Sequence, residues 1–232
     1  MRKQSGFTLI EIAIVLVIIG LLLGGVLKGQ ELITSARVRN LISQQDGIKA
    51  AYFGFLDRFR ALPGDYNAAT TNITGVGTAC NATGNGNGNG QIEGGAGGER
   101  IMAWDHLSKA GFINGSYTCV DGTTVNPNTN PTNPYSMFLV LIYDNVYQDG
   151  AVATGNNRHN LKTGNQIPAD IIAEVDRKVD DGLANRGALR FSAHTGLTTG
   201  TAPTATNCFT AGTGAWIIIG TVEPNCGGTS LF

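Results

Sequence analysis

The sequence predicts an α+β fold in which one long N-terminal helix precedes a loop-rich head that contains a C-terminal antiparallel sheet. Three observations support this prediction. Residues 7–27 form an apolar run with a single charged side chain. Residues 29–60 contain no proline and keep apolar side chains at helical spacing. The remaining residues alternate between stretches rich in Gly, Asn and Thr and short apolar runs, a texture typical of loops and strands.

The long helix is expected to run from about Phe7 to about Arg60 and to have two different halves. At about 1.5 Å per residue, the half at 7–27 is long enough to cross a hydrocarbon core of about 30 Å. The half at 28–60 combines an apolar stripe with several charges, which favours an amphipathic helix packed on a globular domain. Pro63 and Gly64 are expected to stop the helix.

The head, residues 61–232, is expected to begin as loop and to end as sheet. Residues 67–98 predict a surface loop with little to bury, because they are rich in Asn, Thr and Gly. Short helices are predicted at 99–113 and at 168–182, where apolar side chains recur at helical spacing. Strands are predicted from the apolar runs within 136–147, 188–193 and 215–222.

The composition excludes several classes of function. Only 14% of the residues are charged and the formal net charge is -1. A chain with so few and so balanced charges has no broad basic face for a nucleic-acid backbone, so no specific nucleic-acid partner is expected. The apolar content of 42% is enough for a core and excludes disorder throughout the chain.

The first residues carry a specific motif. Arg2 and Lys3 precede the segment 6–11, Gly-Phe-Thr-Leu-Ile-Glu, which opens the apolar run. This pattern resembles the signal of type IV prepilins and pseudopilins. The resemblance implies that 1–6 is a leader peptide, that a membrane peptidase cuts between Gly6 and Phe7, and that the same enzyme methylates the new N-terminus. It also implies that Glu11 pairs with the N-terminal amine of a neighbouring subunit during assembly.

Elementary electrostatics agrees with that implication. Cleavage would free an α-amino group at Phe7 with a pKa near 8, and methylation would leave it a cation. A cation at Phe7 and the anion of Glu11 on adjacent helices would neutralise each other in a medium of low dielectric constant. An acid near the middle of a membrane span costs about 2.5–3.5 kcal/mol on insertion scales, so it is normally functional.

The resemblance therefore implies a structural, filament-forming subunit of a type IV pilus or pilus-like filament, and not an enzyme. Its expected partners are copies of itself and other pilins, the prepilin peptidase and methyltransferase, the inner-membrane assembly platform, and the lipid bilayer before assembly. By the positive-inside rule, Arg2 and Lys3 stay in the cytoplasm. The precursor is thus expected in the inner membrane with its head in the periplasm, and the assembled filament outside the cell or in the periplasm.

Other interpretations of the N-terminal segment remain open. One is a pseudopilin of a type II secretion system, and another is a membrane-tethered adhesive or binding domain that never polymerises. A secretory signal peptide normally has an apolar region of only about 7–15 residues and a small-residue cleavage site, which fits 7–27 poorly. A plain membrane anchor would leave Glu11 unexplained.

The four cysteines all fall in the part of the chain that is expected to be exported. None lies in a Cys-x-x-Cys pair, so an even number in a periplasmic domain indicates disulfides. Three pairings are possible, and the smaller separations favour Cys80 with Cys119 and Cys208 with Cys226; four free, buried thiols are the alternative. The second pair is expected to matter more for the fold, because it brackets the apolar run around Trp216.

Metal and catalytic motifs are weak. Asn85, Asn87 and Asn89 occupy alternate positions before Gly90, as in a calcium-binding loop, but they are neutral amides and the twelfth position is Ala96. They are weak calcium candidates at most, and a flexible loop is the stronger expectation. The three histidines show no metal-ligand spacing, and the sequence predicts no cofactor and no catalytic residue. His106 is expected to be exposed or to cap its helix.

Overall fold

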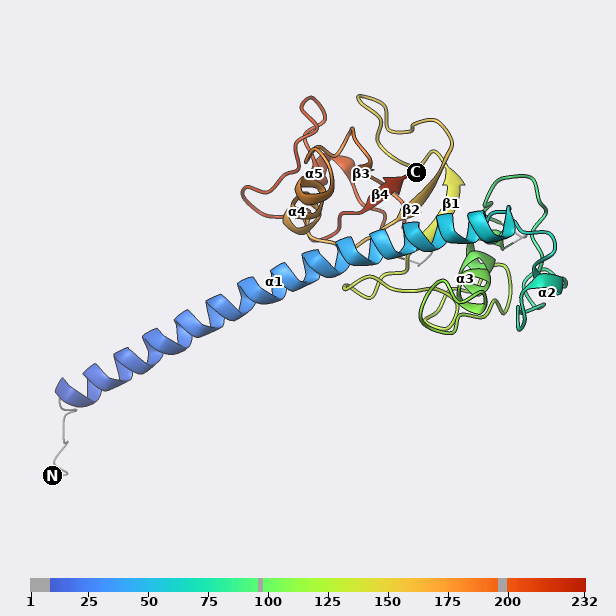
Figure 1. Ribbon diagram of the computed structural model, residues 1–232. Coiled ribbons are helices and arrows are strands. Elements are labelled where there is room, and N and C mark those ends of the chain that lie inside the picture. The colour runs from blue at the N-terminus through green and yellow to red at the C-terminus, as the bar shows by residue number, and fades with distance from the viewer. Residues whose placement is uncertain (1–8, 96–97, 196–199) are drawn as a thin grey trace. The chain divides into compact units, whose positions relative to one another are not determined.

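The computed structural model describes residues 9–95, 98–195 and 200–232 (Figure 1). The chain divides into two compact units, Met1–Arg37 and Val38–Phe232. Helix α1, Leu9–Phe59, provides the described part of the first unit and the opening of the second. The predicted long helix is therefore confirmed over its described length, and it ends just before the Pro63-Gly64 turn.

The second unit contains the remaining elements. Its further helices are α2 (Ala69–Asn72), α3 (Glu99–Lys109), α4 (Ala169–Val179) and α5 (Ala205–Cys208). Its strands are β1 (Val140–Asp144), β2 (Arg158–Lys162), β3 (Leu189–Phe191) and β4 (Gly228–Leu231). They form one antiparallel sheet in the order β1-β2-β4-β3. The predicted antiparallel sheet and the predicted helices near 99 and 169 are confirmed.

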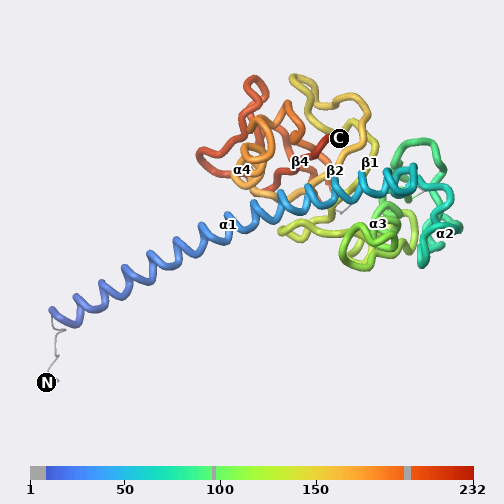
Figure 2. The backbone as a smooth tube through the Cα atoms, viewed as in Figure 1, coloured from blue at the N-terminus to red at the C-terminus, as the bar shows by residue number. Residues whose placement is uncertain are grey.

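The second half of α1 joins two hydrophobic clusters, passing first along α4 and then along α3 (Figure 2). Val38 and Leu41 pack in the first cluster, hereafter the α4 cluster. Four later residues of α1 pack in the second, hereafter the α3 cluster, together with Trp104. These four are Ile48, Ala51, Tyr52 and Phe55. The helix therefore forms one wall of both cores of the second unit.

The described part of 67–98 is loop apart from α2, as predicted, but the expectation that it has little to bury is wrong. Ile73 and Ile92 are buried in the α3 cluster, and the Gly/Asn tract is fixed by carboxylates. Both oxygens of Asp65 accept backbone N–H groups of residues 88–90, at 2.7–3.0 Å. Glu99 accepts the N–H groups of Asn87 and Glu93, each at 3.0 Å. Successive N–H groups wrapped around a carboxylate give this tract an ordered path that its composition does not indicate.

His106 is also buried, contrary to the expectation of an exposed or capping side chain. The N–H of Gly64 donates to its Nδ1 at 3.0 Å, and its Nε2 lies 3.0 Å from the carbonyl oxygen of Gly84. Because Nδ1 is an acceptor, Nε2 carries the proton in the neutral ring. Burial lowers the pKa of His106 to about 4, with the bond to Gly84 opposing that effect. The ring thus links α3 to the turn after α1 and to the Gly/Asn tract.

The predicted strand at 215–222 is wrong as well. Ala215 and Trp216 make only isolated bridges, to Leu183 and Phe209, and Ile219 is 88% exposed. Gly214 and Gly220 both have positive φ and turn the chain on either side of this run. The inner positions of the sheet are instead taken by β2 and β4.

Candidate functional site

The sequence motif falls only in part on described residues. Gly6 and Phe7, the predicted cleavage and methylation positions, lie outside them. Glu11 lies in the first turn of α1 and is exposed. It stands two residues after the beginning of the described helix, within the apolar run that continues to Leu27.

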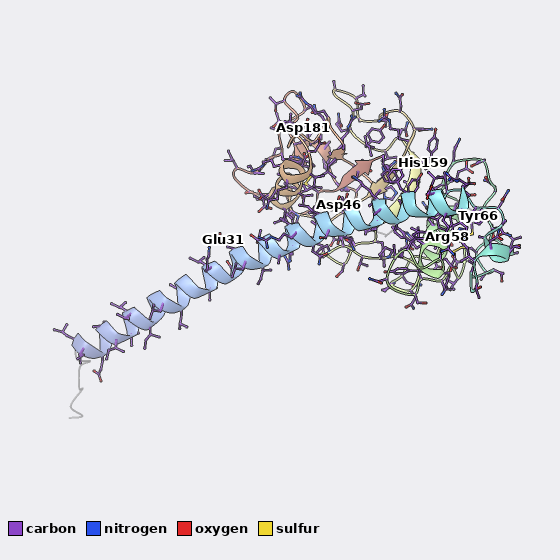
Figure 3. All side chains as sticks on the ribbon, viewed as in Figure 1. Glu31, Asp46, Arg58, Tyr66, His159 and Asp181 are labelled. Atoms are coloured by element: carbon purple, nitrogen blue, oxygen red, sulfur yellow. A yellow bond between two sulfur atoms is a disulfide. The ribbon has the colours of Figure 1, made fainter. Side chains whose placement is uncertain are left out.

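The first half of α1 presents apolar side chains on all of its faces. Every residue from Leu9 to Lys28 is exposed, and Figure 3 draws their side chains projecting all around the helix. The helix is long and apolar enough to cross a membrane, and none of the residues in its most apolar window is buried. A helix that is hydrophobic all round needs an apolar medium on every side, which water does not provide.

The apolar half ends in a short polar stretch. Lys28 and Glu31 form an exposed ion pair at 2.7 Å, and such surface pairs contribute about 0–1 kcal/mol. Residues 30–37 are exposed, and Val38 is the first buried residue of the helix. One continuous helix therefore changes from an exposed apolar surface to a packed amphipathic one over about ten residues.

The four cysteines form two disulfides in the second unit. Cys80 pairs with Cys119 and Cys208 pairs with Cys226, with Cα atoms 5.3 and 5.8 Å apart. These are the pairs that the smaller sequence separations favour. The first disulfide encloses α3 and the buried Ile92, whereas the second encloses Trp216 and the exposed Ile219.

The three asparagines with a calcium-loop pattern are engaged in local hydrogen bonds. Oδ1 of Asn85 accepts from Thr70, Oδ1 of Asn87 accepts the N–H of Asn89 at 2.9 Å, and Oδ1 of Asn89 accepts the N–H of Gln91 at 2.9 Å. The side-chain amides of Asn87 and Asn89 donate to Glu93. Their oxygens satisfy the turns of the tract, which explains the pattern without an ion.

Sequence reasoning missed a different group of oxygens at the end of α4. Asp176, Asp180 and Asp181 place one carboxylate oxygen each within 4.8 Å of one another. The signal was available, because residues 176 and 180 are four apart and therefore lie on one face of a helix. The prediction of a helix at 168–182 rests on its apolar residues and makes no use of the acids at its end.

The comparison with protein families connects the N-terminal segment to a known signal. Residues 1–27 match the family model for the prokaryotic N-terminal methylation motif. The comparison with curated proteins found no match, and neither did the comparison with solved structures. The matched residues include Gly6, Phe7 and Glu11, and they end where the apolar run ends.

The match agrees with the architecture. A long N-terminal apolar helix followed by an antiparallel four-stranded sheet is an α+β pilin-like arrangement. The motif implies processing by a prepilin peptidase, and it points to a structural protein anchored in a membrane before assembly. Residues 1–27 are the prokaryotic N-terminal methylation motif, so the chain carries the type IV prepilin-type signal.

Proposed function

We propose that this chain is the precursor of a structural subunit that polymerises through α1 into a type IV pilus or pilus-like filament. One observation carries the proposal: the methylation motif runs directly into a helix whose apolar side chains are exposed on every face. That surface needs lipid before assembly and neighbouring helices after it. No catalytic residue takes part in this function.

The leader is residues 1–6, and cleavage between Gly6 and Phe7 removes the cations of Arg2 and Lys3. The membrane-spanning half is 7–27, the amphipathic half is 28–60, and the exported part is 61–232. The two cations hold the leader in the cytoplasm, so the rest of the chain faces the periplasm. The prepilin peptidase and methyltransferase act at this boundary, and the inner-membrane assembly platform receives the product.

Glu11 directs the addition of one subunit beside another. Its carboxylate lies four residues after Phe7, about one helical turn from the methylated amine that processing creates. A neighbouring helix displaced along the filament axis brings its own cationic N-terminus to this carboxylate. In an apolar medium the two charges attract strongly, and the attraction fixes the register of the two helices.

Mass spectrometry tests the processing step. The protein purified from membranes of an expressing bacterium should begin at Phe7 and be heavier by one methyl group. A Gly6→Ala variant provides a comparison, because it alters only the residue before the cleaved bond. An N-terminus beyond Lys28 would identify an ordinary signal peptide and end the filament proposal.

Replacement of Glu11 tests the assembly step. Glu11→Ala should accumulate normally in the membrane, because a costly charge has been removed from the span. It should yield few filaments, because the cationic terminus of the adjacent subunit loses its partner. Glu31→Ala is the matched control, since Glu31 lies on the same helix but outside the apolar run. Normal filament yield from Glu11→Ala would contradict the pairing of Glu11 with the neighbouring N-terminus.

The location of the filaments decides between the two kinds of assembly. Surface filaments sheared from cells should contain this chain if it belongs to a type IV pilus. Filaments confined to the periplasm, together with loss of protein export when the gene is deleted, would identify a pseudopilus of a type II secretion system instead.

A further inference from the structure

The chain contains four Asn-Gly pairs, a sequence in which the asparagine side chain is prone to lose its amide. Three lie in the Gly/Asn tract and begin at Asn85, Asn87 and Asn89, and the fourth is Asn114 with Gly115, in the loop that follows α3 (Figure 1). In such a pair the backbone nitrogen of the glycine is adjacent to the side-chain carbonyl carbon, and glycine has no Cβ to obstruct their approach. The four pairs share this local chemistry, so the folded structure decides which of them reacts.

The reaction is an attack by a backbone amide on a side-chain amide. The glycine nitrogen loses its proton and bonds to Cγ of the asparagine, the C–N bond of the side-chain amide breaks, and ammonia leaves with that proton. The product is a cyclic imide, a succinimide. Water then opens the ring at either carbonyl and leaves aspartate or isoaspartate. Water is the only co-reactant, and nothing is oxidised or reduced.

Exposure to water does not distinguish the pairs. Asn87, Asn89 and Asn114 are all exposed, and so are the glycines that follow them. The hydrogen bonds of the glycine N–H groups do distinguish the pairs, because the reaction removes this proton. A hydrogen bond that stabilises the protonated form of a group makes its proton harder to remove.

In the Gly/Asn tract all three glycine N–H groups have acceptors. The N–H of Gly86 donates to the carbonyl oxygen of Tyr66 at 2.9 Å. The N–H of Gly88 donates to Oδ1 of Asp65 at 2.7 Å, and the N–H of Gly90 donates to Oδ2 at 2.8 Å. A carboxylate in contact with an N–H group holds the proton and repels the negative charge that its loss would leave on the nitrogen. Asp65 therefore opposes the first step of the reaction.

The asparagine side chains of the tract are held as well. Oδ1 of Asn85 accepts the backbone N–H and the hydroxyl of Thr70, at 2.9 and 3.1 Å. The side-chain amides of Asn87 and Asn89 donate to Glu93, each at 3.0 Å. Ring closure brings the side chain to the following nitrogen, so movement away from these partners must come first. Both reacting groups of the tract are therefore restrained.

Asn114 and Gly115 have neither restraint. Among the described residues, the N–H of Gly115 donates no hydrogen bond and the side chain of Asn114 makes none. The ammonium of Lys109 donates to the hydroxyl of Ser116, directly after the pair, at 3.2 Å. A cation near the pair favours loss of the proton from the glycine nitrogen, whereas the anion of Asp65 disfavours it in the tract.

We propose that Asn114 is a site of spontaneous deamidation in the folded protein, and that Asp65 protects the Gly/Asn tract from the same reaction. Deamidation replaces an amide with a carboxylate, so the chain gains one negative charge. Asn114 lines a cavity of about 320 Å³ beside α1, together with Gln44, Ile48 and Tyr117. The new charge therefore forms at the wall of that cavity. This inference does not depend on the filament function.

Incubation of the full-length protein in detergent at mildly alkaline pH tests the proposal. Reduction and digestion at mildly acidic pH follow, and cleavage after Arg100 and Lys109 places the tract and Asn114 on separate peptides for mass spectrometry. The Asn114 peptide should gain the mass difference between an amide and an acid, and incubation in water labelled with heavy oxygen should label that acid. The tract peptide should react at least about tenfold more slowly, the factor expected from one hydrogen bond to a charged group.

Unfolded protein is the matched comparison. In denaturant the pairs lose their tertiary contacts, so each pair of the tract should react at a rate similar to that of Asn114. In the folded protein, Asn114→Gln should abolish the acid product in its peptide, because a side chain longer by one methylene closes its ring poorly. Asn128→Gln is the control variant and should leave the product unchanged, because Asn128 is exposed on the same peptide but precedes a threonine.

Asp65→Asn tests the protective role. It removes the charge that holds the N–H groups of Gly88 and Gly90, so the tract should react roughly tenfold or more faster. Asn114 should keep its rate, since it lies in another loop. If this variant does not fold, the comparison of the two peptides within the unchanged protein still decides the proposal.

Three results would overturn the proposal. One is an Asn114 peptide that keeps its amide for as long as the tract peptide does. Another is deamidation of the tract and of Asn114 at equal rates in the folded protein, which would show that the hydrogen bonds of Asp65 give no protection. The third is an undiminished acid product in Asn114→Gln, which would place the reaction at another residue.

Discussion

The two halves of α1 have opposite relations to the rest of the protein. Among the described residues 9–37, none is buried, although most of 9–27 are apolar. From Val38 to Phe55, seven residues are buried, and they include the polar Gln45. Apolar composition and burial within this chain are therefore separate properties, and the more apolar half is the one that the chain itself does not cover.

The difference indicates which surroundings stabilise each half. The packed half is held by the α3 and α4 clusters, so its stability belongs to the second unit. Under the proposed function, the exposed half is stabilised by lipid or by other helices, and the second unit should be insensitive to changes there. Four predictions test this division, beginning with the largest expected effect.

Phe55→Ala should lower the free energy of unfolding of the second unit by about 3–5 kcal/mol. Phe55 is 0% exposed and contacts the rings of Phe59 and Phe112, with centroids 4.6 and 5.9 Å away. Leu16→Ala, in the exposed half, should change that free energy by less than about 0.5 kcal/mol. Denaturant unfolding of both variants in detergent measures the contrast. Equal losses would show that the halves unfold as one unit.

Removal of the disulfides should give the next largest effects, in an order opposite to the one the sequence suggests. By loop closure alone, the separations of 39 and 18 residues are worth about 4 and about 3 kcal/mol. The Cys80–Cys119 loop also encloses the buried Trp104 and Ile92, whereas Cys208–Cys226 encloses no sheet strand.

Cys80→Ser with Cys119→Ser should therefore lower the melting temperature more than Cys208→Ser with Cys226→Ser. Non-reducing peptide mapping of the unchanged protein provides the control for the pairing. A larger loss of melting temperature from the C-terminal double replacement would show that the Trp216 segment contributes more to stability than the Cys80–Cys119 loop.

Acidification should destabilise the second unit through His106. The folded pKa, about 4, lies below the ordinary value of 6.5, so the unfolded chain binds more protons in this window. Stability from this group is therefore present above about pH 6.5 and is lost as pH falls toward 4, by about 3 kcal/mol in all. His106→Gln should show a smaller difference in unfolding free energy between pH 7 and pH 4.5. If His106→Gln and the unchanged protein had the same pH dependence of unfolding free energy, His106 would not be the cause of the acid destabilisation.

The smallest effect is expected at the junction of the two halves. Lys28→Ala breaks an ion pair whose two side chains are each 66% exposed, so the unfolding free energy should change by less than about 1 kcal/mol. Thermal unfolding at low and high salt measures this. A large loss of unfolding free energy would show that the Lys28–Glu31 pair stabilises the protein more than an ordinary exposed ion pair does.

The helices could be predicted from the sequence because their signals are local. The continuous run of α1 and the periodic apolar residues of α3 and α4 each predict a helix from neighbouring residues alone. The motif at 6–11 was equally local. Stop signals also worked, since Pro63 and Gly64 follow the last helical residues of α1.

The inner strands could not be predicted in this way. β2 reads Arg-His-Asn-Leu-Lys and β4 reads Gly-Thr-Ser-Leu, and neither alternates between apolar and polar residues. The buried ammonium of Lys162 donates to Asp144 of β1 at 2.8 Å and to the carbonyl oxygen of Val146 at 2.9 Å, and the buried hydroxyl of Thr229 donates to Asn160. Such strands are stabilised by partners distant in sequence. The run at 217–219 is apolar, yet it pairs with no strand of the sheet among the described residues.

The carboxylates were hidden for the same reason. Asp65 and Glu99 organise the Gly/Asn tract through backbone N–H groups, an interaction that depends on the path of the chain and on no side-chain pattern. Asp176 gains its partner Trp216 from a segment 40 residues later. Sequence spacing reveals neither contact.

The position of β4 also determines when the sheet can form. Ribosomes make β1, β2 and β3 before residues 228–231, yet β2 and β3 each pair with β4 and not with one another. In a nascent chain that stops short of Gly228, the edges of β2 and β3 that pair with β4 have no partner strand. Unpaired strand edges can pair with other chains. Of the four described strands, β4 is synthesised last although it is an internal one, so this sheet stays unfinished until translation has passed Leu231.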